Sequence, residues 1–225
     1  MKILHHYGSE FNTNAAEIIV PEIIRLFEPK SVIDVGCGIG SWLKVYKQNG
    51  IIEFLGIDGF HIKSKDLLID DRFFIPTDLE TLRPDDFKKF DICQCLEVAE
   101  HLSENAAIRF IENLTSLSDI IIFSAAVPGQ TGENHKNEQP FSYWVDIFRL
   151  FNFDCYDIFR EKYWSNPKIE WWYKQNMFSF IKQGKQTSNF KKYNGNEYIH
   201  PELLKMYVDA LSTKNAENFN HLFNR

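Results

Sequence analysis

Val32 to Gly40, with the sequence VIDVGCGIG, is the stretch that decides the fold of this 225-residue chain. Its first half is rich in β-branched residues, which is typical of a short strand covered on both faces. Its second half is a glycine-rich turn, and the segment Ser41 to Gln48 that follows has helical character. A strand that runs through glycines into a helix N-terminus predicts an α/β fold with a nucleotide-type cofactor at the turn.

The spacing of the glycines and the charge beside them indicate the kind of cofactor. A dinucleotide-binding turn reads GxGxxG, whereas here Gly40 comes one residue early and Ser41 takes the expected place. Asp34 precedes the first glycine by two residues, and no Lys or Arg between residues 31 and 42 offsets its charge. A carboxylate there repels a pyrophosphate and attracts an amino group or a sulfonium. We therefore expect a cationic cofactor.

Charge and composition exclude several classes of function. The formal net charge of −6 disfavours a nucleic-acid partner, because such binding depends on clustered Lys and Arg. The sequence shows no basic-then-apolar signal segment and no run of about 18 apolar residues, which indicates a cytoplasmic protein without a membrane span. The four cysteines lack metal-ligand spacing and are expected to stay reduced, and Cys93 and Cys95, two residues apart on a predicted strand, are expected to be buried packing residues.

Alternating apolar and helical stretches predict a doubly wound, mostly parallel seven-stranded sheet with an antiparallel last strand. One domain is expected over 1–225, with an N-terminal helical cover over 1–30 and a C-terminal loop and amphipathic helix over 185–225. Pro21 is expected to interrupt or restart the first helix. After the strand at the glycine turn, strands are predicted over 51–57, 72–75, 91–98, 119–124, 153–159 and 176–182. The apolar stripe of the last helix is predicted to contain Leu203, Leu204, Tyr207, Val208 and Leu211.

Acidic residues follow the next two predicted strands. Asp58 comes about 20 residues after the glycines, where a carboxylate can accept hydrogen bonds from two ribose hydroxyls. Asp58-Gly59 is also a common turn sequence. Asp78 follows the third strand, where an aspartate either contacts a ligand or caps a helix.

The glycine turn, Asp58, Asp78 and the run LEVAEHL (96–102), in this order, resemble the motifs of class I S-adenosylmethionine-dependent methyltransferases. The resemblance covers residues 31–124 and implies a Rossmann-like fold with S-adenosylmethionine as cofactor. It implies that Asp58 binds the ribose, that Asp78 contacts the adenine amino group with Leu79 offering a backbone amide, and that His101 faces the acceptor. The residues it assigns to the cofactor are Asp34, Gly36, Cys37, Gly38, Gly40, Trp42, Asp58, Gly59, Asp78, Leu79, Leu96 and Glu97.

A long polar loop, AAVPGQTGENHKNEQP (125–140), follows the fifth strand and should lie over the ligand face of the sheet. The stretches 124–144 and EWWYKQNMF (170–178) resemble a bacterial methyltransferase subgroup that is often associated with surface-polysaccharide genes. Members of that subgroup often carry GHxNEQ, whereas Glu133 and Asn134 precede His135 here.

A hydroxyl acceptor must be aligned with the methyl group and must lose its proton. His135 is the first candidate for the base and His101 the second, although a histidine just before a helix often only orients another group. Glu97, Glu100 and His101 lack a distinctive ligand spacing, so no metal site is predicted. The expected acceptor contacts are Asn134, Asn137, Glu138, Gln139, Tyr143, Trp171, Trp172 and Tyr173, with core packing as the alternative for the aromatic cluster.

The sequence thus predicts an enzyme that methylates a hydroxyl of a sugar, a sugar nucleotide or another small polar or phosphorylated acceptor in surface-polysaccharide biosynthesis. N-methylation of a small amine and a non-catalytic, cofactor-binding partner protein are the alternatives. The early third glycine and Asp34 disfavour a nicotinamide oxidoreductase. The acidic balance and the absence of an Asn/Asp-Pro-Pro-Tyr/Phe run after the fourth strand disfavour a nucleic-acid base methyltransferase.

Overall fold

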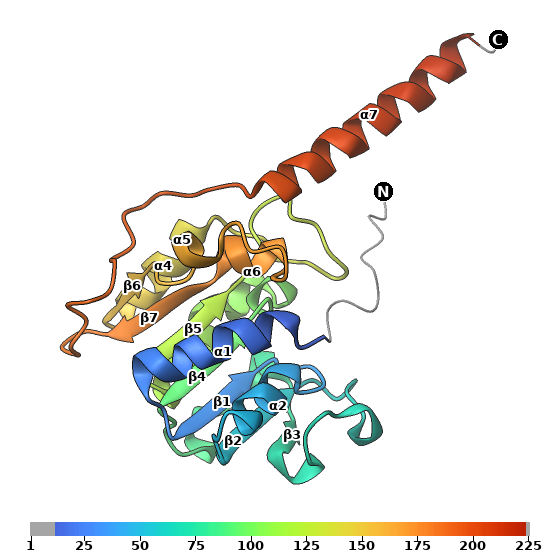
Figure 1. Ribbon diagram of the computed structural model, residues 1–225. Helices are drawn as coiled ribbons and strands as arrows, with labels where there is room; N and C mark the ends of the chain where they lie inside the picture. The colour runs from blue at the N-terminus through green and yellow to red at the C-terminus, as the bar shows by residue number, and fades with distance from the viewer. Residues whose placement is uncertain (1–11, 224–225) are drawn as a thin grey trace.

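A seven-stranded sheet forms the centre of the molecule, in a computed structural model that describes residues 12–223 and the side chains of residues 12–212. Its strands are β1 (Ser31–Val35), β2 (Glu53–Asp58), β3 (Phe74–Pro76), β4 (Ile92–Leu96), β5 (Ile120–Ser124), β6 (Phe153–Tyr156) and β7 (Phe178–Lys182). They lie in the order β3-β2-β1-β4-β5-β7-β6 (Figure 1). Only β7 is antiparallel to its neighbours, β5 and β6. The predicted mostly parallel sheet with an antiparallel last strand is confirmed.

Alternation along the strands divides the apolar core into two layers. Val32 and Ile122 belong to the layer beneath α1 and α2, whereas Ile33 and Ile121 belong to the layer beneath α3 and α4. Neighbouring residues of a strand point to opposite faces, so apolar residues at successive positions require helices on both sides. The α-helices are α1 (Asn14–Phe27), α2 (Ser41–Gln48), α3 (Ala107–Leu117), α4 (Phe141–Leu150), α5 (Arg160–Tyr163), α6 (Trp171–Asn176) and α7 (Pro201–Phe223).

Several predicted boundaries were wrong because short helices replace the ends of predicted strands. The prediction 72–75 began in what is the 3-10 helix η2 (Asp71–Phe73), where the Asp70 side chain accepts a hydrogen bond from the Arg72 amide. Asn176, predicted to begin the last strand, ends α6. Pro21 does not interrupt α1, since the helix continues through it. Pro21 is exposed, so water can satisfy the carbonyl that its missing N–H leaves unpaired.

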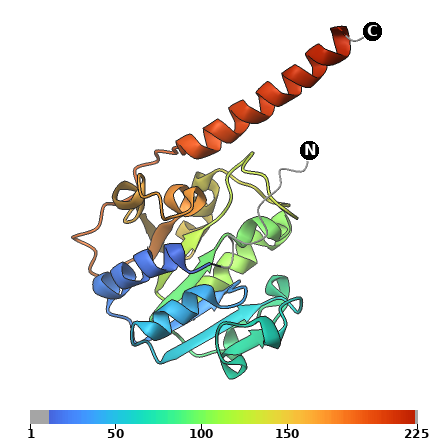
Figure 2. The ribbon, with the colours of Figure 1, turned by 45° about the vertical axis from the view of Figure 1, so that its right-hand side comes forward.

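The predicted C-terminal helix is present, but most of its apolar stripe is not packed. Helix α7 extends away from the sheet in both ribbon views (Figure 1, Figure 2). Leu203 in its first turn is buried, whereas Leu204, Val208 and Leu211 are exposed. Residues 1–11 of the predicted N-terminal cover lie outside the described residues, and the expected single domain over 1–225 stays a prediction. Within the described part of the chain, no helix combines the length and apolar character that a membrane crossing requires.

Candidate functional site

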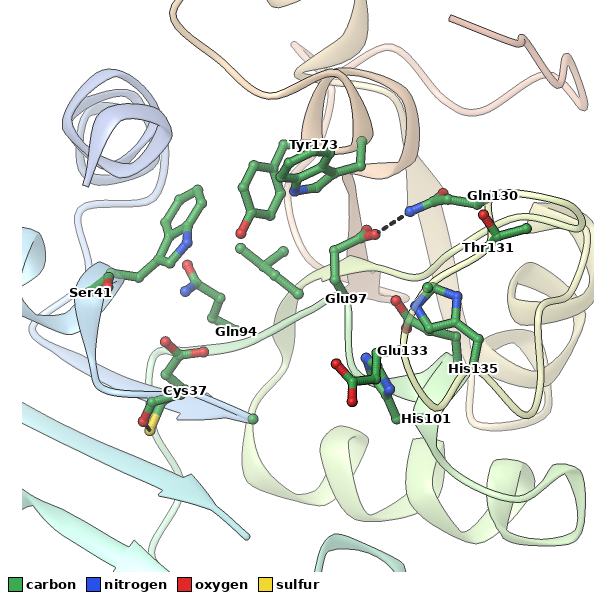
Figure 3. A pocket seen from close by; sticks show the side chains of 18 residues that line it. Cys37, Ser41, Gln94, Glu97, His101, Gln130, Thr131, Glu133, His135 and Tyr173 are labelled. Carbon is green, nitrogen blue, oxygen red and sulfur yellow. Dashed lines mark hydrogen bonds between the residues drawn. The ribbon is translucent and has the colours of Figure 1, made fainter. Parts of the chain in front are cut away.

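A cavity of about 310 Å³ lies at the carboxyl ends of β1 and β4, between the glycine turn and the polar loop 125–140 (Figure 3). This is the edge of a doubly wound sheet at which ligands bind. Both predicted histidines and most of the predicted residues of the turn are brought together there. The lining consists of Asp34, Gly36, Cys37, Gly38, Ser41, Trp42, Gln94, Leu96, Glu97, Glu100, His101, Gln130, Thr131, Gly132, Glu133, His135, Trp172 and Tyr173.

Backbone hydrogen bonds fix the glycine turn after β1. The amide of Gly36 donates to the carbonyl oxygen of Ile57 at 2.7 Å, and the amide of Gly38 donates to Oδ2 of Asp58 at 2.6 Å. Gly36 has a φ of +83°, and a Cβ there would lie 2.2 Å from Cγ2 of Val98. Glycine is therefore required at this position both for the backbone conformation and for the close approach of the segment after β4.

Asp34 places a carboxyl group at the buried end of the cavity, with only 2% of its surface exposed. Burial raises the pKa of Asp34 to about 7, with a partial offset from Gln94 and a further rise from the charge of Asp58. Gln94 is its partner in register on β4 and accepts a hydrogen bond from the Tyr46 hydroxyl at 3.1 Å. Because burial destabilises the charged form of Asp34, a cation in the cavity would stabilise that charged form.

Asp58 and Gly59 lie outside the cavity lining. Asp58 uses both carboxylate oxygens on the backbone, since Oδ1 accepts from the amide of Gly59 at 2.5 Å and Oδ2 accepts from the glycine turn. The side chain therefore connects the ends of β1 and β2. The turn expected as an alternative is present, and binding of the ribose by Asp58 stays a prediction.

The other three predicted cofactor residues outside the lining are Gly40, Asp78 and Leu79. Gly40 is the N-cap of α2, and its amide donates to the carbonyl of Cys37 at 2.9 Å. Asp78 is exposed and caps a 3-10 helix, η3 (Leu79–Thr81), by accepting a hydrogen bond from the Glu80 amide at 3.0 Å. Leu79 is buried. Contact of Asp78 with adenine stays a prediction, because the helix cap accounts for one of its two oxygens.

Glu97 connects three parts of the site that are distant in sequence. Its backbone has a φ of +55°, and burial raises its pKa. Oε2 accepts a hydrogen bond from Nε2 of Gln130 at 2.8 Å, drawn in Figure 3, and Oε1 accepts one from Nδ2 of Asn176 at 3.2 Å. The same Asn176 nitrogen also donates to Oε1 of Gln130 at 2.8 Å. This network holds the loop 125–140 against the ends of β4 and α6.

His135 lies at the cavity wall with a carboxylate behind it. Nδ1 of His135 is 2.7 Å from Oε1 of Glu138, and Oε2 of Glu138 accepts a hydrogen bond from the Gly129 amide at 2.7 Å. A Cβ on Gly132 would lie 2.1 Å from Nε2 of His135, so glycine is needed at 132 for the imidazole to occupy this place. The loop thus orients one ring nitrogen of His135 and leaves the other toward the site.

His101 and Glu100 meet His135 across the cavity. The rings of His101 and His135 lie edge to face, with centroids 4.8 Å apart. Burial and the neighbouring His135 lower the pKa of His101, while a hydrogen bond to the Asn134 backbone raises it in part. Glu100 has no exposed surface, and its burial together with the charge of Glu97 holds its pKa well above the usual range. The three side chains offer one carboxylate and two imidazoles within 4.8 Å of one another.

The predicted acceptor residues are only partly brought to this cavity. Trp172 and Tyr173 line it, and Tyr173 lies edge-on to Trp42 at 5.3 Å. Trp171 is buried behind Trp172, and Tyr143 packs against the core on α4. The burial of Trp171 agrees with the core-packing alternative, and contact of Trp171 or Tyr143 with an acceptor stays a prediction.

The polar acceptor candidates mostly support the loop itself. Asn137 is buried, and its backbone N–H donates to the backbone carbonyl of Glu100 at 3.0 Å. Its side-chain Oδ1 accepts a hydrogen bond from Nε2 of Gln139 at 2.8 Å. Asn134 is exposed, and Glu138 holds His135. None of these four side chains is part of the cavity lining.

Seven lining residues were missed as individual site residues by sequence reasoning. Gln94 could have been predicted from the sequence. A polar side chain within the apolar strand ICQCL is costly to bury unless it has a hydrogen-bond partner or a ligand. The loop was predicted as a whole, but which of its side chains turn inward depends on its folded path. The residues missed are Ser41, Gln94, Glu100, Gln130, Thr131, Gly132 and Glu133.

Comparisons with solved structures identify the fold. The methyltransferase domain of bacterial CtHen1-C superposes with a TM-score of 0.57 at 18% identity, over 75% of this chain and 97% of that one. Magnesium protoporphyrin IX methyltransferase (ChlM) from Synechocystis PCC 6803, with bound SAH, gives 0.55 at 18% identity, over 81% and 90%. Small RNA methyltransferase HEN1 gives 0.55 at 17% identity, over 85% and 28%. No curated protein sequence matches the chain.

Residues 10–152 match a family model described as a methyltransferase domain. This span contains the glycine turn, Asp58, the LEVAEHL run and the polar loop with His135. It covers well over half of the chain, and the sheet order and the position of the cavity agree with it. The chain therefore belongs to the methyltransferase domain family, as an enzyme whose cofactor is S-adenosylmethionine.

Proposed function

We propose that this enzyme methylates a hydroxyl group of a small polar acceptor, a sugar or sugar nucleotide used in surface-polysaccharide synthesis. The observation that carries the proposal is the His135–Glu138 pair, with 2.7 Å between Nδ1 and the carboxylate. A carboxylate on one ring nitrogen fixes the tautomer and the ring orientation, so that the other nitrogen can accept a proton. Removal of a hydroxyl proton therefore depends on His135, and His101 is the second histidine at the same place.

The lining of the cavity fits S-adenosylmethionine. Among the described residues that form it, four are acidic (Asp34, Glu97, Glu100 and Glu133) and none is Lys or Arg. Such a lining attracts a cation, and the cofactor carries both a sulfonium and an amino group. The bound cofactor supplies an electrophilic methyl group on a neutral leaving group. Asp34 would hold the cationic end, with Trp42 and Leu96 as apolar contacts.

The acceptor side lies toward the polar loop. Thr131, Glu133 and Trp172 line the same cavity as His135 and combine hydrogen-bonding groups with an aromatic surface. Sugars present hydroxyls at their edge and C–H groups on their face, so this combination suits them. The resemblance of stretch 124–144 to the surface-polysaccharide subgroup supports the same choice. Solved neighbours include a small RNA methyltransferase and a porphyrin methyltransferase, but a net charge of −6 disfavours RNA for this chain.

Product analysis tests the proposal. The enzyme is incubated with cofactor carrying a CD3 group and a panel of sugar nucleotides and phosphorylated sugars, and a mass increase of about 17 Da identifies the acceptor. His135→Ala should lower turnover by about 10²- to 10⁴-fold while cofactor binding measured by calorimetry is retained. His61→Ala is the matched control, because the His61 side chain is 75% exposed and lies outside the cavity.

Two results would contradict this assignment. Full turnover by His135→Ala would remove that residue from the mechanism. Label found on nitrogen of a small amine, and on no hydroxyl, would replace O-methylation by N-methylation.

A further inference from the structure

We propose that Glu100, His101 and His135 bind a divalent transition-metal cation at the acceptor end of the cavity. One potential ligand atom from each side chain lies within 4.8 Å of the others. One carboxylate and two imidazoles form a ligand set that suits Zn²⁺, Co²⁺ or Mn²⁺. Mg²⁺ and Ca²⁺ prefer all-oxygen ligands and are not expected to bind with comparable affinity.

The burial of the Glu100 carboxyl group is the strongest single observation in favour of a cation. Its side chain has no exposed surface, and within the described part of the chain neither carboxylate oxygen has a hydrogen bond of normal geometry. The amides of Glu100 and Ala126 lie near the carboxylate without forming hydrogen bonds of normal geometry, and the carboxylate of Glu97 is a further neighbour. Buried carboxylates are normally paired or bound to a metal. A cation between Glu100 and the two histidines would supply that partner.

The imidazole of His135 is anchored through Nδ1, which leaves Nε2 for a ligand bond, and the imidazole of His101 contacts the backbone of Asn134. Nδ1 of His135 is held by Glu138, which itself is fixed by the Gly129 amide. His101 is hydrogen-bonded to the backbone of Asn134. Metal-binding histidines commonly use their second ring nitrogen in this way, because the outer contact fixes the ring orientation and the tautomer.

The backbone already holds the two halves of this ligand set together. His101 follows Glu100 in a 3-10 helix, whereas His135 lies on the loop 125–140. The amides of Lys136 and Asn137, just after His135, both donate to the Glu100 carbonyl, at 2.8 and 3.0 Å. Two ligand atoms of a tetrahedral Zn²⁺ site are about 3.4 Å apart. Ligand atoms that are now up to 4.8 Å apart must therefore approach each other by as much as about 1.4 Å when the cation binds.

The catalytic role of the cation, unlike its binding, rests on the proposed O-methylation. A hydroxyl that coordinated a divalent cation would have a lower pKa and would give its proton to solvent water. Its oxygen would then form the bond to the methyl group, while the methyl–sulfur bond of the cofactor breaks and the neutral thioether leaves. His135 then acts as a ligand, and turnover depends on it through the metal instead of through a free imidazole base.

Metal titration of the full-length, tag-free chain tests the inference without relying on activity. The protein is freed of metal with a chelator and titrated with Co²⁺, followed by visible absorption, and with Zn²⁺, followed by calorimetry. We expect one ion per chain and at least tenfold weaker binding by Glu100→Gln and by His101→Asn. Glu112→Gln is the matched control, since Glu112 is exposed on α3 and outside the cavity.

The melting temperature of Glu100→Gln shows whether this variant is correctly folded. It replaces a buried carboxyl group by an amide of the same shape, so its melting temperature without metal should equal or exceed that of the wild type. The wild type should gain stability with Zn²⁺, and Glu100→Gln should gain much less.

Equal affinity of the wild type and Glu100→Gln for Co²⁺, or no binding by the wild type, would overturn the metal site. O-methylation that persists at full rate in chelator would agree with that outcome and leave the proposed function intact. Conversely, Glu100-dependent binding of one ion together with a product methylated on nitrogen would retain the metal site and reject the proposed function.

Discussion

Gly36 and Gly184 both have positive φ angles, +83° and +90°, but differ in their surroundings. A Cβ on Gly36 would lie 2.2 Å from Val98, whereas a Cβ on Gly184 would have nothing within 4 Å. Gly184→Ala therefore adds only backbone strain, about 1 kcal/mol, and Gly36→Ala should lower the free energy of unfolding by about 3 kcal/mol or more. Urea denaturation of both variants measures the difference. Equal losses would show that the close approach to Val98 does not contribute to the free energy of unfolding.

Asp34 should make stability depend on pH. Its pKa is about 7 in the folded chain against an ordinary 3.8, so between these values the folded chain holds a proton that the unfolded chain has lost. Stability therefore falls as pH rises through this window and changes no further above it. The full effect is about 4 kcal/mol, of which about 2–3 kcal/mol falls between pH 5 and pH 8.

Asp34→Asn isolates this effect from other titrating groups. Relative to this variant, the wild type should lose about 2–3 kcal/mol of unfolding free energy between pH 5 and pH 8, as measured by urea denaturation at both pH values. The variant should also bind S-adenosylmethionine more weakly, because a neutral amide does not attract a cation. A wild-type-to-variant difference that stays constant with pH would contradict the shifted pKa.

The helices and strands that follow from local sequence could be predicted. Groups of side chains that are brought together by contacts between distant segments could not. The strand before Gly36 and the helix after it follow from apolar periodicity and glycine chemistry within one short segment. The His101–His135 pair depends on the folded path of the loop 125–140, which hydrogen bonds to the Glu100 carbonyl and the Glu97 network hold in place. Ligand spacing along the chain does not reveal such a cluster.

Helix α7 offers a matched pair of leucines at its first turn. Leu203 is 2% exposed and Leu204 is 56% exposed. Leu203→Ala should lower the free energy of unfolding by about 2–4 kcal/mol, through loss of buried area and a residual cavity, and Leu204→Ala should stay within about 0.5 kcal/mol of the wild type. Chemical denaturation of both variants checks this. A comparable loss for Leu204→Ala would mean that the exposed stripe is covered in solution.

At the scale of the whole molecule, overall charge and the charge of the cavity have the same sign. The chain has 31 acidic and 25 basic residues, and the described residues that line the cavity include four acidic side chains and no Lys or Arg. A negative molecule with a negative site attracts cations at both long and short range. An acceptor with many phosphates meets repulsion at both ranges, so the acceptor is expected to carry few charges.

This whole-molecule charge gives the last prediction, which concerns RNA. Non-specific nucleic-acid binding at physiological salt typically has a Kd of about 10⁻⁴ to 10⁻⁶ M and results from phosphate neutralisation by clustered basic residues. For this chain we expect no increase in the anisotropy of a fluorescent single-stranded RNA at 150 mM salt, and no salt-dependent binding when the salt is lowered to 50 mM. Binding that strengthens steeply as salt is removed would reveal a basic surface sufficient for RNA, and methylation of that RNA would then displace the sugar acceptor.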